Sequence, residues 1–461
     1  MDALSKQSRG PAWTNRRYWT QLFDYWQYHM RRRFDSFIKM RIDFEGHLDE
    51  GLLAEAVERS CVTLPLIACR FNTDPWVWRR WVPRREASRE ILRVVEAPGC
   101  LEEEVHRAFG EIIDIEQGPQ LHLVLIRDEQ RDSLCILINH MVCDAVGLKT
   151  YIGVLASLYS RLAEGLDPVP PPFCSKRSIW PVVRGFTLRE FLQAARTKPR
   201  DLDGKDEEAT EEDESAAGEP TADEPSQEDS PPPDENPFEI VTASLSAEDF
   251  ARIRATAKAR GLTVNDAFLG ALGFAWHRAT GSDVVILPCS LDMRRFAPPR
   301  ARIGITNLAS TCICYAEIPP EGTMEDVLMQ VVNEMRVYKG GVPGLYQFLR
   351  WLFFSKITSL AKMDSDVFDT FSKYDTLSSS NMGTISEECV SFATVPVRAA
   401  CLLLPTIPAP AFSIGVSTFR DIPTFSLCVK GDDEGRASIK NVFALLMEEL
   451  ASFELTEDKL G

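Results

Sequence analysis

An acidic stretch at residues 201–236 is the feature of this sequence that most restricts its fold. It holds 16 Asp and Glu residues, one Lys and almost no large apolar side chains. Such a stretch cannot bury enough surface to offset the entropy lost on ordering, so we interpret it as a disordered linker. It separates two pieces of similar length, 1–200 and 237–461, which we take as an N-terminal and a C-terminal lobe.

The charge of the chain is concentrated in the same stretch. The whole sequence carries a net charge of −17, and 16 acids against one Lys account for −15 of it. The rest of the chain is therefore nearly neutral at about −2. Nothing in this balance favours a nucleic acid as a partner.

Both pieces mix strand and helix patterns. Alternating apolar residues predict strands, and apolar residues spaced three and four apart predict helices. We therefore expect an α/β protein with two lobes, each a sheet packed with helices. The expected strands are 37–44, 121–126, 134–142, 239–245, 284–288, 412–419 and 425–430, and the expected helices are 48–62, one from 148, 246–261 and 264–278.

The cysteines and the N-terminal sequence predict a protein of a reducing compartment. The 12 Cys form no CxxC pair, and most lie in apolar runs, which is typical of reduced, buried thiols. The start of the chain lacks the basic-then-apolar profile of a signal peptide, so we expect a cytoplasmic protein. The six His are dispersed, and we predict no metal site. An aromatic-rich segment at 345–360 could contact lipid, but core packing is the favoured interpretation.

The run from Leu134 to Gly147 carries the residues best suited to chemistry. A β-rich segment brings His140 to its end, and Asp144 follows where an amphipathic helix begins. The simplest interpretation is that Asp144 caps the helix and His140 is a hydrogen-bonded core residue. Sequence context outside this run favours a second interpretation.

The stretch Asn139-His-Met-Val-Cys-Asp-Ala145 resembles the HHxxxDG motif of the condensation-domain/chloramphenicol-acetyltransferase superfamily. His140 matches the second His of the motif, and Asp144 matches its Asp. Further segments resemble other parts of this superfamily in the same order along the chain, over roughly 37–445 apart from the acidic stretch. These segments are 44–57, 64–71, 115–125, 261–271, 291–295, 303–308 and 379–383.

The resemblance implies a fold and a reaction. The two lobes would form a V, with a channel between them and His140 near its midpoint. His140 would act as a general base while an acyl group passes from a thioester, acyl-CoA in the first instance, to a hydroxyl or amine of a small molecule. No covalent intermediate is needed, so Cys143 is not required as a nucleophile. Asp144 would orient the site through an arginine, for which Arg294 is the candidate.

Two positions depart from the motif. Asn139 replaces the first His, and Ala145 replaces the Gly, where its methyl group could narrow the channel; Gly147 could restore some backbone freedom. Asn139, Asn307 and Asn381 are candidates to line the channel.

Two alternatives to the CoA-dependent enzyme stay open. One is a condensation-like enzyme that uses a carrier-protein thioester, and the other is an inactive relative that serves as a binding or scaffold protein. An arginine cluster at 31–33, with Arg16 and Arg17, could meet a CoA phosphate or an acidic carrier. We expect no tightly bound cofactor and a monomer. The N-terminal aromatic residues from Trp13 to Met30 predict a helix that docks on the body or on a membrane surface. Docking on the body is favoured, and we do not expect a membrane partner.

Overall fold

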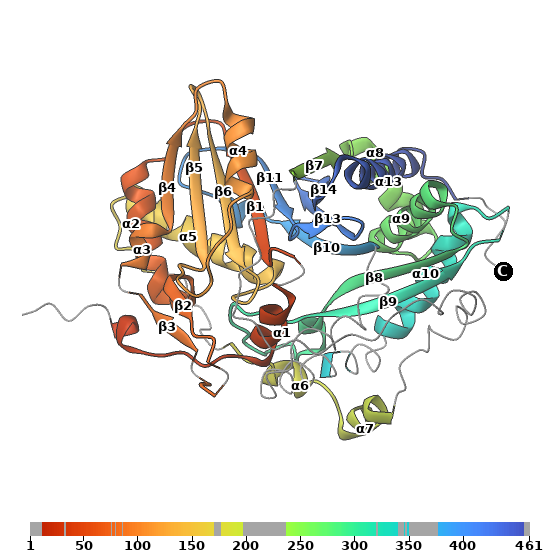
Figure 1. The fold of residues 1–461 in the computed structure, drawn as a ribbon, viewed down its shortest axis with the longest axis horizontal. Coiled ribbons are helices and arrows are strands. Elements are labelled where there is room, and N and C mark those ends of the chain that lie inside the picture. Colours follow the sequence, from red (N-terminus) through yellow and green to blue (C-terminus); the bar gives the residue numbers. More distant parts are fainter. Residues whose placement is uncertain are drawn as a thin grey trace, which may run out of the picture.

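The computed structural model describes residues 12–31, 34–74, 76–78, 80–84, 86–169, 177–196, 237–319, 321–339, 345, 348–349 and 377–455. The acidic stretch 201–236, Arg32 and Arg33, and most of the segment 345–360 lie outside the described residues. The described chain forms two lobes, each built on a sheet with helices packed against it (Figure 1).

The first lobe is built on a five-stranded sheet. Alternate residues of its strands enter two apolar clusters, because successive side chains point to opposite faces. On β1, Ile38 and Met40 join a cluster with α2 and α5, whereas Phe37 joins a cluster with α4 on the other face. The strand order is β11 (Val397–Leu403), β1 (Phe37–Phe44), β6 (Asp132–Asn139), β5 (Leu121–Arg127), β4 (Leu92–Glu96), and the helices are α2 (Glu50–Thr63), α4 (Leu101–Phe109) and α5 (Ala145–Ala163).

The second lobe is built on a larger mixed sheet. Its strand β10 runs parallel to both neighbours, β8 and β13, whereas β8 with β9 and β13 with β14 are antiparallel pairs. The strand order is β12 (Ile407–Pro408), β14 (Ile422–Lys430), β13 (Phe412–Phe419), β10 (Leu377–Ile385), β8 (Val284–Asp292), β9 (Ala309–Glu317), with β7 (Phe238–Ser244) on β14. The helices of this lobe are α8 (Ala247–Ala259), α9 (Val264–Thr280), α10 (Met324–Lys339) and α13 (Asp433–Ala451).

One strand crosses from the second piece of the chain into the first lobe. β11 pairs antiparallel with β1 and forms the edge of the five-stranded sheet. It also touches the second sheet, because the backbone N–H of Leu402 donates to the Ser417 hydroxyl (3.0 Å) and its carbonyl accepts from Ser426 (3.1 Å). The two sheets are therefore joined through one strand.

Most of the predicted elements are present. The hairpins β5–β6 and β13–β14 form in antiparallel register, and Ser246 caps α8 through the backbone N–H of Asp249. The N-terminal helix α1 (Leu22–Met30) docks on the body as predicted, with Phe23 and Met30 buried. Among the described residues, no helix has both the length and the apolar character needed to span a membrane.

Candidate functional site

His140 is the first residue after β6, a strand held between β1 and β5. Its backbone N–H donates to the carbonyl of Ser36 (2.8 Å), which fixes the end of the strand. The side chain is half-buried. Burial lowers the pKa of the imidazole below its usual range, against weaker opposing contributions from backbone carbonyls and from the charge of Asp144. The neutral ring, which can accept a proton, is therefore favoured.

Asn307 brings the second piece of the chain to this histidine. Its side-chain nitrogen Nδ2 lies 2.9 Å from His140 Nδ1 and 3.3 Å from the His140 carbonyl. Its oxygen Oδ1 accepts from the backbone N–H of Ala309 (3.2 Å). Asn307 was predicted to line a channel; the structure places it, almost fully buried, in direct contact with the imidazole.

Asp144 and Arg294 form a buried ion pair. Arg294 donates from Nη1 to Oδ2 (2.7 Å) and from Nη2 to Oδ1 (3.0 Å) of Asp144. The backbone N–H groups of Gly147 (2.9 Å) and Leu308 (2.8 Å) donate to the same carboxylate. Burial works to lower the pKa of Arg294, but the charges of Asp144 and Asp292 outweigh it and raise that pKa. The ion pair expected between Asp144 and Arg294 is present, and it ties the start of α5 to the second piece of the chain.

Gly147 is needed for space, not for an unusual backbone conformation. Its φ is not in the left-handed region, in contrast to our expectation of extra backbone freedom. A Cβ atom at this position would lie 2.6 Å from the Cβ of Cys143 and 3.4 Å from the carbonyl of Thr306. A side chain here would therefore push apart the turn that follows His140.

We expect Gly147→Ala to lower the free energy of unfolding by roughly 1–3 kcal/mol, because its methyl group has no room. Gly153, in the same helix, is a matched control, since the nearest atom to its added Cβ is 3.6 Å away. Gly153→Ala should be neutral or stabilise by about 0.5–1 kcal/mol, as alanine favours helix. Urea unfolding of both variants measures the difference, and equal effects would contradict this account.

Asn139 is held inside the first lobe, and its predicted place in a channel stays a prediction. Its side chain is almost fully buried and donates from Nδ2 to the side-chain oxygen of Gln120 (2.7 Å). Its Oδ1 accepts from the backbone N–H of Met141 (2.9 Å). Asn139 thus shapes the turn after β6. Ala145 is the first residue of α5, and its methyl group packs on the core of the first lobe.

Asn381 has hydrogen-bond partners of its own. It is exposed on β10, where its Nδ2 donates to the side chain of Asn265 (3.0 Å) and its Oδ1 accepts from the backbone N–H of Gly383 (2.9 Å). Among the interactions of the described residues, none joins it to the imidazole. Its amide supports a bulge in the strand, and its predicted place in a channel stays a prediction.

We did not predict from the sequence that Arg177 holds the turn after His140 by hydrogen bonds. Arg177 donates to the carbonyls of Met141 (2.7 Å) and Val142 (3.1 Å). Its guanidinium is held by both carboxylate oxygens of Asp24 on α1 (2.8 and 3.0 Å). The indole N–H of Trp81 donates to the same carboxylate (2.9 Å). The N-terminal helix therefore supports the site through one buried ion pair.

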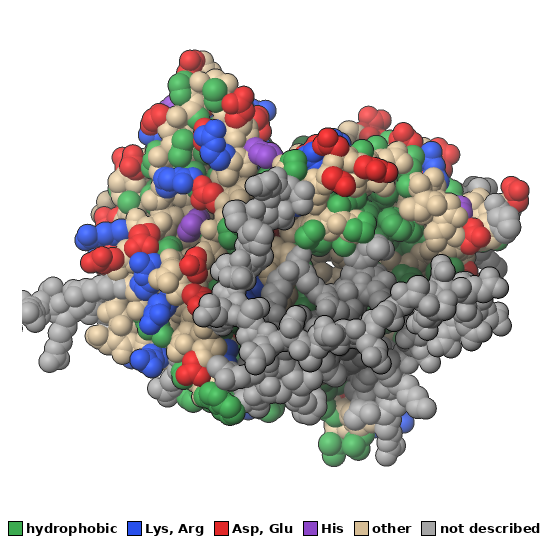
Figure 2. All heavy atoms as spheres, viewed as in Figure 1, with side chains coloured by type: hydrophobic (Ala, Val, Ile, Leu, Met, Phe, Trp, Pro, Cys, Tyr) green, Lys and Arg blue, Asp and Glu red, His purple; other side chains and the backbone are tan. Residues whose placement is uncertain are grey.

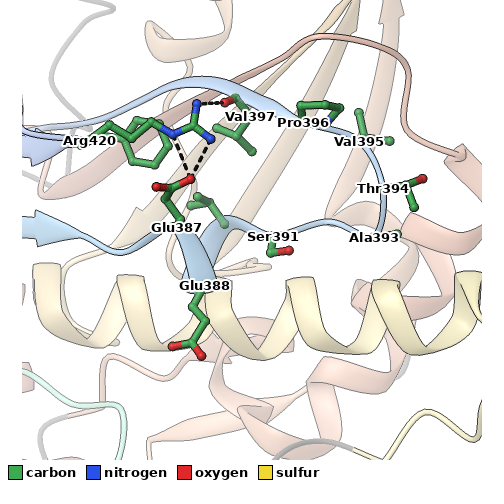
Figure 3. Close-up of a pocket in the computed structure, with 11 residues that line it drawn as sticks. Glu387, Glu388, Ser391, Ala393, Thr394, Val395, Pro396, Val397 and Arg420 are labelled. Carbon is green, nitrogen blue, oxygen red and sulfur yellow. Dashed lines mark hydrogen bonds and ion pairs between the residues drawn. The ribbon is translucent and has the colours of Figure 1, made fainter.

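Other candidate groups are less suited to chemistry. Cys143 is fully buried, and burial raises the pKa of its thiol well above its usual range. The described residues form no group of His, Cys, Asp or Glu suited to a metal ion. A surface hollow of about 290 Å³ is lined by residues of η5 (Glu387–Val390), the loop into β11 and Arg420 (Figure 3). It contains none of the predicted site residues.

Comparison with known proteins identifies the fold. No family model matches the sequence. A segment of 135 residues, 27% of this chain, is 24% identical to surfactin synthase subunit 1 of Bacillus subtilis, and the match covers only 4% of that protein. The first condensation domain of the CDA synthetase matches 96% of this chain and 98% of its own, with a TM-score of 0.63 and 14% identity. The chain has the condensation-domain fold.

Two further solved structures share the condensation-domain fold with this chain. One is polyketide synthase associated protein 5 from Mycobacterium tuberculosis (TM-score 0.58, 17% identity, 95% of this chain and 99% of that chain). The other is the epimerization domain from the third module of tyrocidine synthetase B (TM-score 0.57, 14% identity, 95% and 97%). The predicted fold class and its two lobes are confirmed.

Proposed function

We propose that this protein transfers an acyl group from a thioester to a hydroxyl or amine, with His140 as the general base. The observation that carries the proposal is the half-buried imidazole at a strand end, contacted by Asn307 from the other piece of the chain. Its lowered pKa keeps the ring neutral, as a base near neutral pH requires. The names of the structural neighbours, condensation domains among them, support transfer chemistry.

In the proposed reaction the acceptor oxygen or nitrogen attacks the thioester carbonyl and loses its proton to Nε2 of His140. The resulting tetrahedral intermediate collapses by breaking the carbon–sulfur bond, and the thiolate leaves. Thiols ionise near pH ~8.5, so the thiolate is a good leaving group, and the proton on His140 returns to it. Asp144 and Arg294 hold the backbone around the base and take no proton. No tightly bound cofactor takes part, and acyl-CoA or an acyl carrier serves as co-substrate.

Asn307 governs which ring nitrogen of His140 is free. With Oδ1 on Ala309, the amide presents an N–H to Nδ1 and favours the tautomer with the proton on Nε2. A base at Nε2 needs the proton on Nδ1. A half-turn of the amide presents Oδ1 to Nδ1–H, and it gives up both the bond from Ala309 N–H to Oδ1 and the bond from Nδ2 to the His140 carbonyl. We propose that this turn accompanies substrate binding.

Asn307→Asp tests this role. A carboxylate accepts from both Nδ1–H and Ala309 N–H, so it satisfies the base tautomer without the half-turn, and its charge raises the pKa of His140. For the unmodified protein, the neutral ring is the active form, so kcat/KM should fall only below pH ~6.5. In Asn307→Asp that fall should move up by about one pH unit. Initial rates of thiol release over a range of pH measure it.

Asn307→Leu serves as the comparison, because it removes the amide without adding charge. We expect it to lower the rate without moving the acid limb of the pH profile upward. If Asn307→Asp leaves the limb where it is in the unmodified protein, the proton that matters is not on His140.

An assay with both classes of thioester determines which donor the protein uses. Acyl-CoA esters and acyl groups on a carrier protein are each offered with a panel of small alcohols and amines, and thiol release is followed. The carrier-bound thioester is the second candidate donor, because structural neighbours of this chain are named as condensation domains. Release with CoA esters alone supports the small-molecule enzyme, and release with the carrier alone supports the condensation-like enzyme.

A further inference from the structure

Exposed large apolar side chains gather on three segments of the first piece of the chain, around residue 19, at 76–78 and at 180–192. The four tryptophans that are exposed among the described residues all lie there, together with two leucines of α7 (Leu188–Arg196). These segments lie along the lower edge of the molecule in Figure 1, near the labels β2 (Cys69–Phe71), β3 (Trp81–Pro83), α6 (Trp180–Val183) and α7. We call this set the basal face; it comprises Trp19 (54% exposed), Trp76 (68%), Trp78 (47%), Trp180 (61%), Leu188 (77%) and Leu192 (51%).

Trp19 and Trp78 of the basal face lie on backbone that is held by hydrogen bonds. Thr20, next to Trp19, donates its backbone N–H to the carbonyl of Trp78 (2.9 Å). Tyr18 forms a β-bridge with Trp81, which is fully buried. The same short pairing therefore anchors one tryptophan inside the lobe and leaves its neighbours at the surface.

The helix α7 presents its two leucines outward. Leu188 and Leu192 are one helical turn apart, so they lie on one side of the helix. Phe186 packs against Phe296 of the second lobe, with ring centroids 5.1 Å apart, and anchors the start of this segment. Figure 2 shows apolar side chains at the position of α7, which projects from the lower edge of the body.

Positive charge accompanies these apolar side chains. Arg70 and Arg89 are exposed in the first-lobe part of this face, whereas Arg80 is buried and Arg84 is paired with Glu90. Arg16 and Arg17 are exposed beside Trp19, and Arg184 and Arg189 are exposed around α7. These six exposed arginines outnumber the exposed acids of the same segments, which are Asp74, Glu86 and Glu90.

We propose that the basal face docks on an anionic lipid membrane. Indoles favour the interface between headgroups and acyl chains, leucines of a short amphipathic helix enter its apolar side, and arginines are attracted to anionic headgroups. A projecting helix and separate indoles fit a deformable surface, whereas a protein partner would need a matching pocket for each side chain. This proposal is independent of the chemistry at His140.

The test is co-sedimentation of the full chain with vesicles of phosphatidylcholine, with and without phosphatidylserine. We expect binding to the anionic vesicles at least about tenfold tighter than to the neutral ones, weakening as salt is added. Tryptophan emission should shift to the blue on binding. The double variant Leu188→Asp/Leu192→Asp should lose at least about tenfold in affinity, since it removes apolar area and adds negative charge.

Ile112→Asp/Val337→Asp is the matched control. Both side chains are exposed aliphatics outside the basal face (77% and 58%), so this variant makes the same chemical change elsewhere and should bind vesicles as the unmodified protein does. Absence of binding, equal binding to neutral vesicles, or equal losses in the two double variants would overturn the proposal. So would self-association of the chain that the Leu188→Asp/Leu192→Asp variant abolishes, because the basal face would then bind a second copy.

Discussion

Replacing His140 by Ala should lower the rate of thiol release from the thioester donor by about 10²–10⁴-fold, the usual contribution of a general base. The change should leave the free energy of unfolding within about 1 kcal/mol of its original value. Asn307 loses one partner but keeps the carbonyl of residue 140 and the N–H of Ala309. Initial rates with a saturating donor and urea unfolding of the same preparation measure the two effects.

His122→Ala is the control for this experiment. His122 lies on the neighbouring strand β5, is half-buried and has Nδ1 3.5 Å from a carboxylate oxygen of Glu111. Its loss should leave the rate unchanged. Thiol release that persists in His140→Ala would remove His140 from the base role. An unmodified protein that releases thiol from no donor would favour the binding or scaffold function.

Replacing Arg294 by Ala should lower the free energy of unfolding by about 3–5 kcal/mol, because the Asp144 carboxylate would stay buried without its counter-charge. Two backbone N–H groups would still donate to Asp144, but neither neutralises it. Arg294→Lys should recover only part of the loss, since an ammonium cannot make two parallel bonds to a carboxylate. Chemical denaturation monitored by intrinsic fluorescence measures all of these values.

Arg59→Ala provides the matched comparison, because Arg59 forms an exposed pair with Glu55 at 3.0 Å on α2. An exposed pair of this kind contributes about 0.3–0.5 kcal/mol. If Arg294→Ala were as mild as Arg59→Ala, the ion pair at the start of α5 would not hold the two pieces of the chain together.

Helices and strands were predictable from the sequence where the apolar periodicity and the capping residues indicate the same element. The hairpin of β5 and β6 and the start of α5 at Asp144 both follow from patterns of neighbouring residues. The end of β6 was not predictable in this way. The predicted strand ended at Val142, whereas β6 ends at Asn139. Asn139 turns the chain earlier by accepting the N–H of Met141 through its side chain. A single side-chain hydrogen bond of this kind leaves no trace in apolar periodicity.

The candidate site was predictable in part. His140, Asp144 and Arg294 came from the motif resemblance, and their geometry agrees with it, although their roles in catalysis stay predictions. The contact of Asn307 with the imidazole and the support of the turn by Arg177 were not predictable. Each joins segments far apart in the chain, and a lone polar residue in one sequence carries no signal for its distant partner.

The place of β11 has a consequence for how the protein can be divided. A fragment ending at residue 200 would lack the strand that covers the edge of β1, and bare edges of this kind invite aggregation. The C-terminal fragment would carry the same strand without a mate. The acidic stretch therefore separates two parts of the sequence but not two domains that fold independently. Each part contains a strand that pairs with a strand of the other.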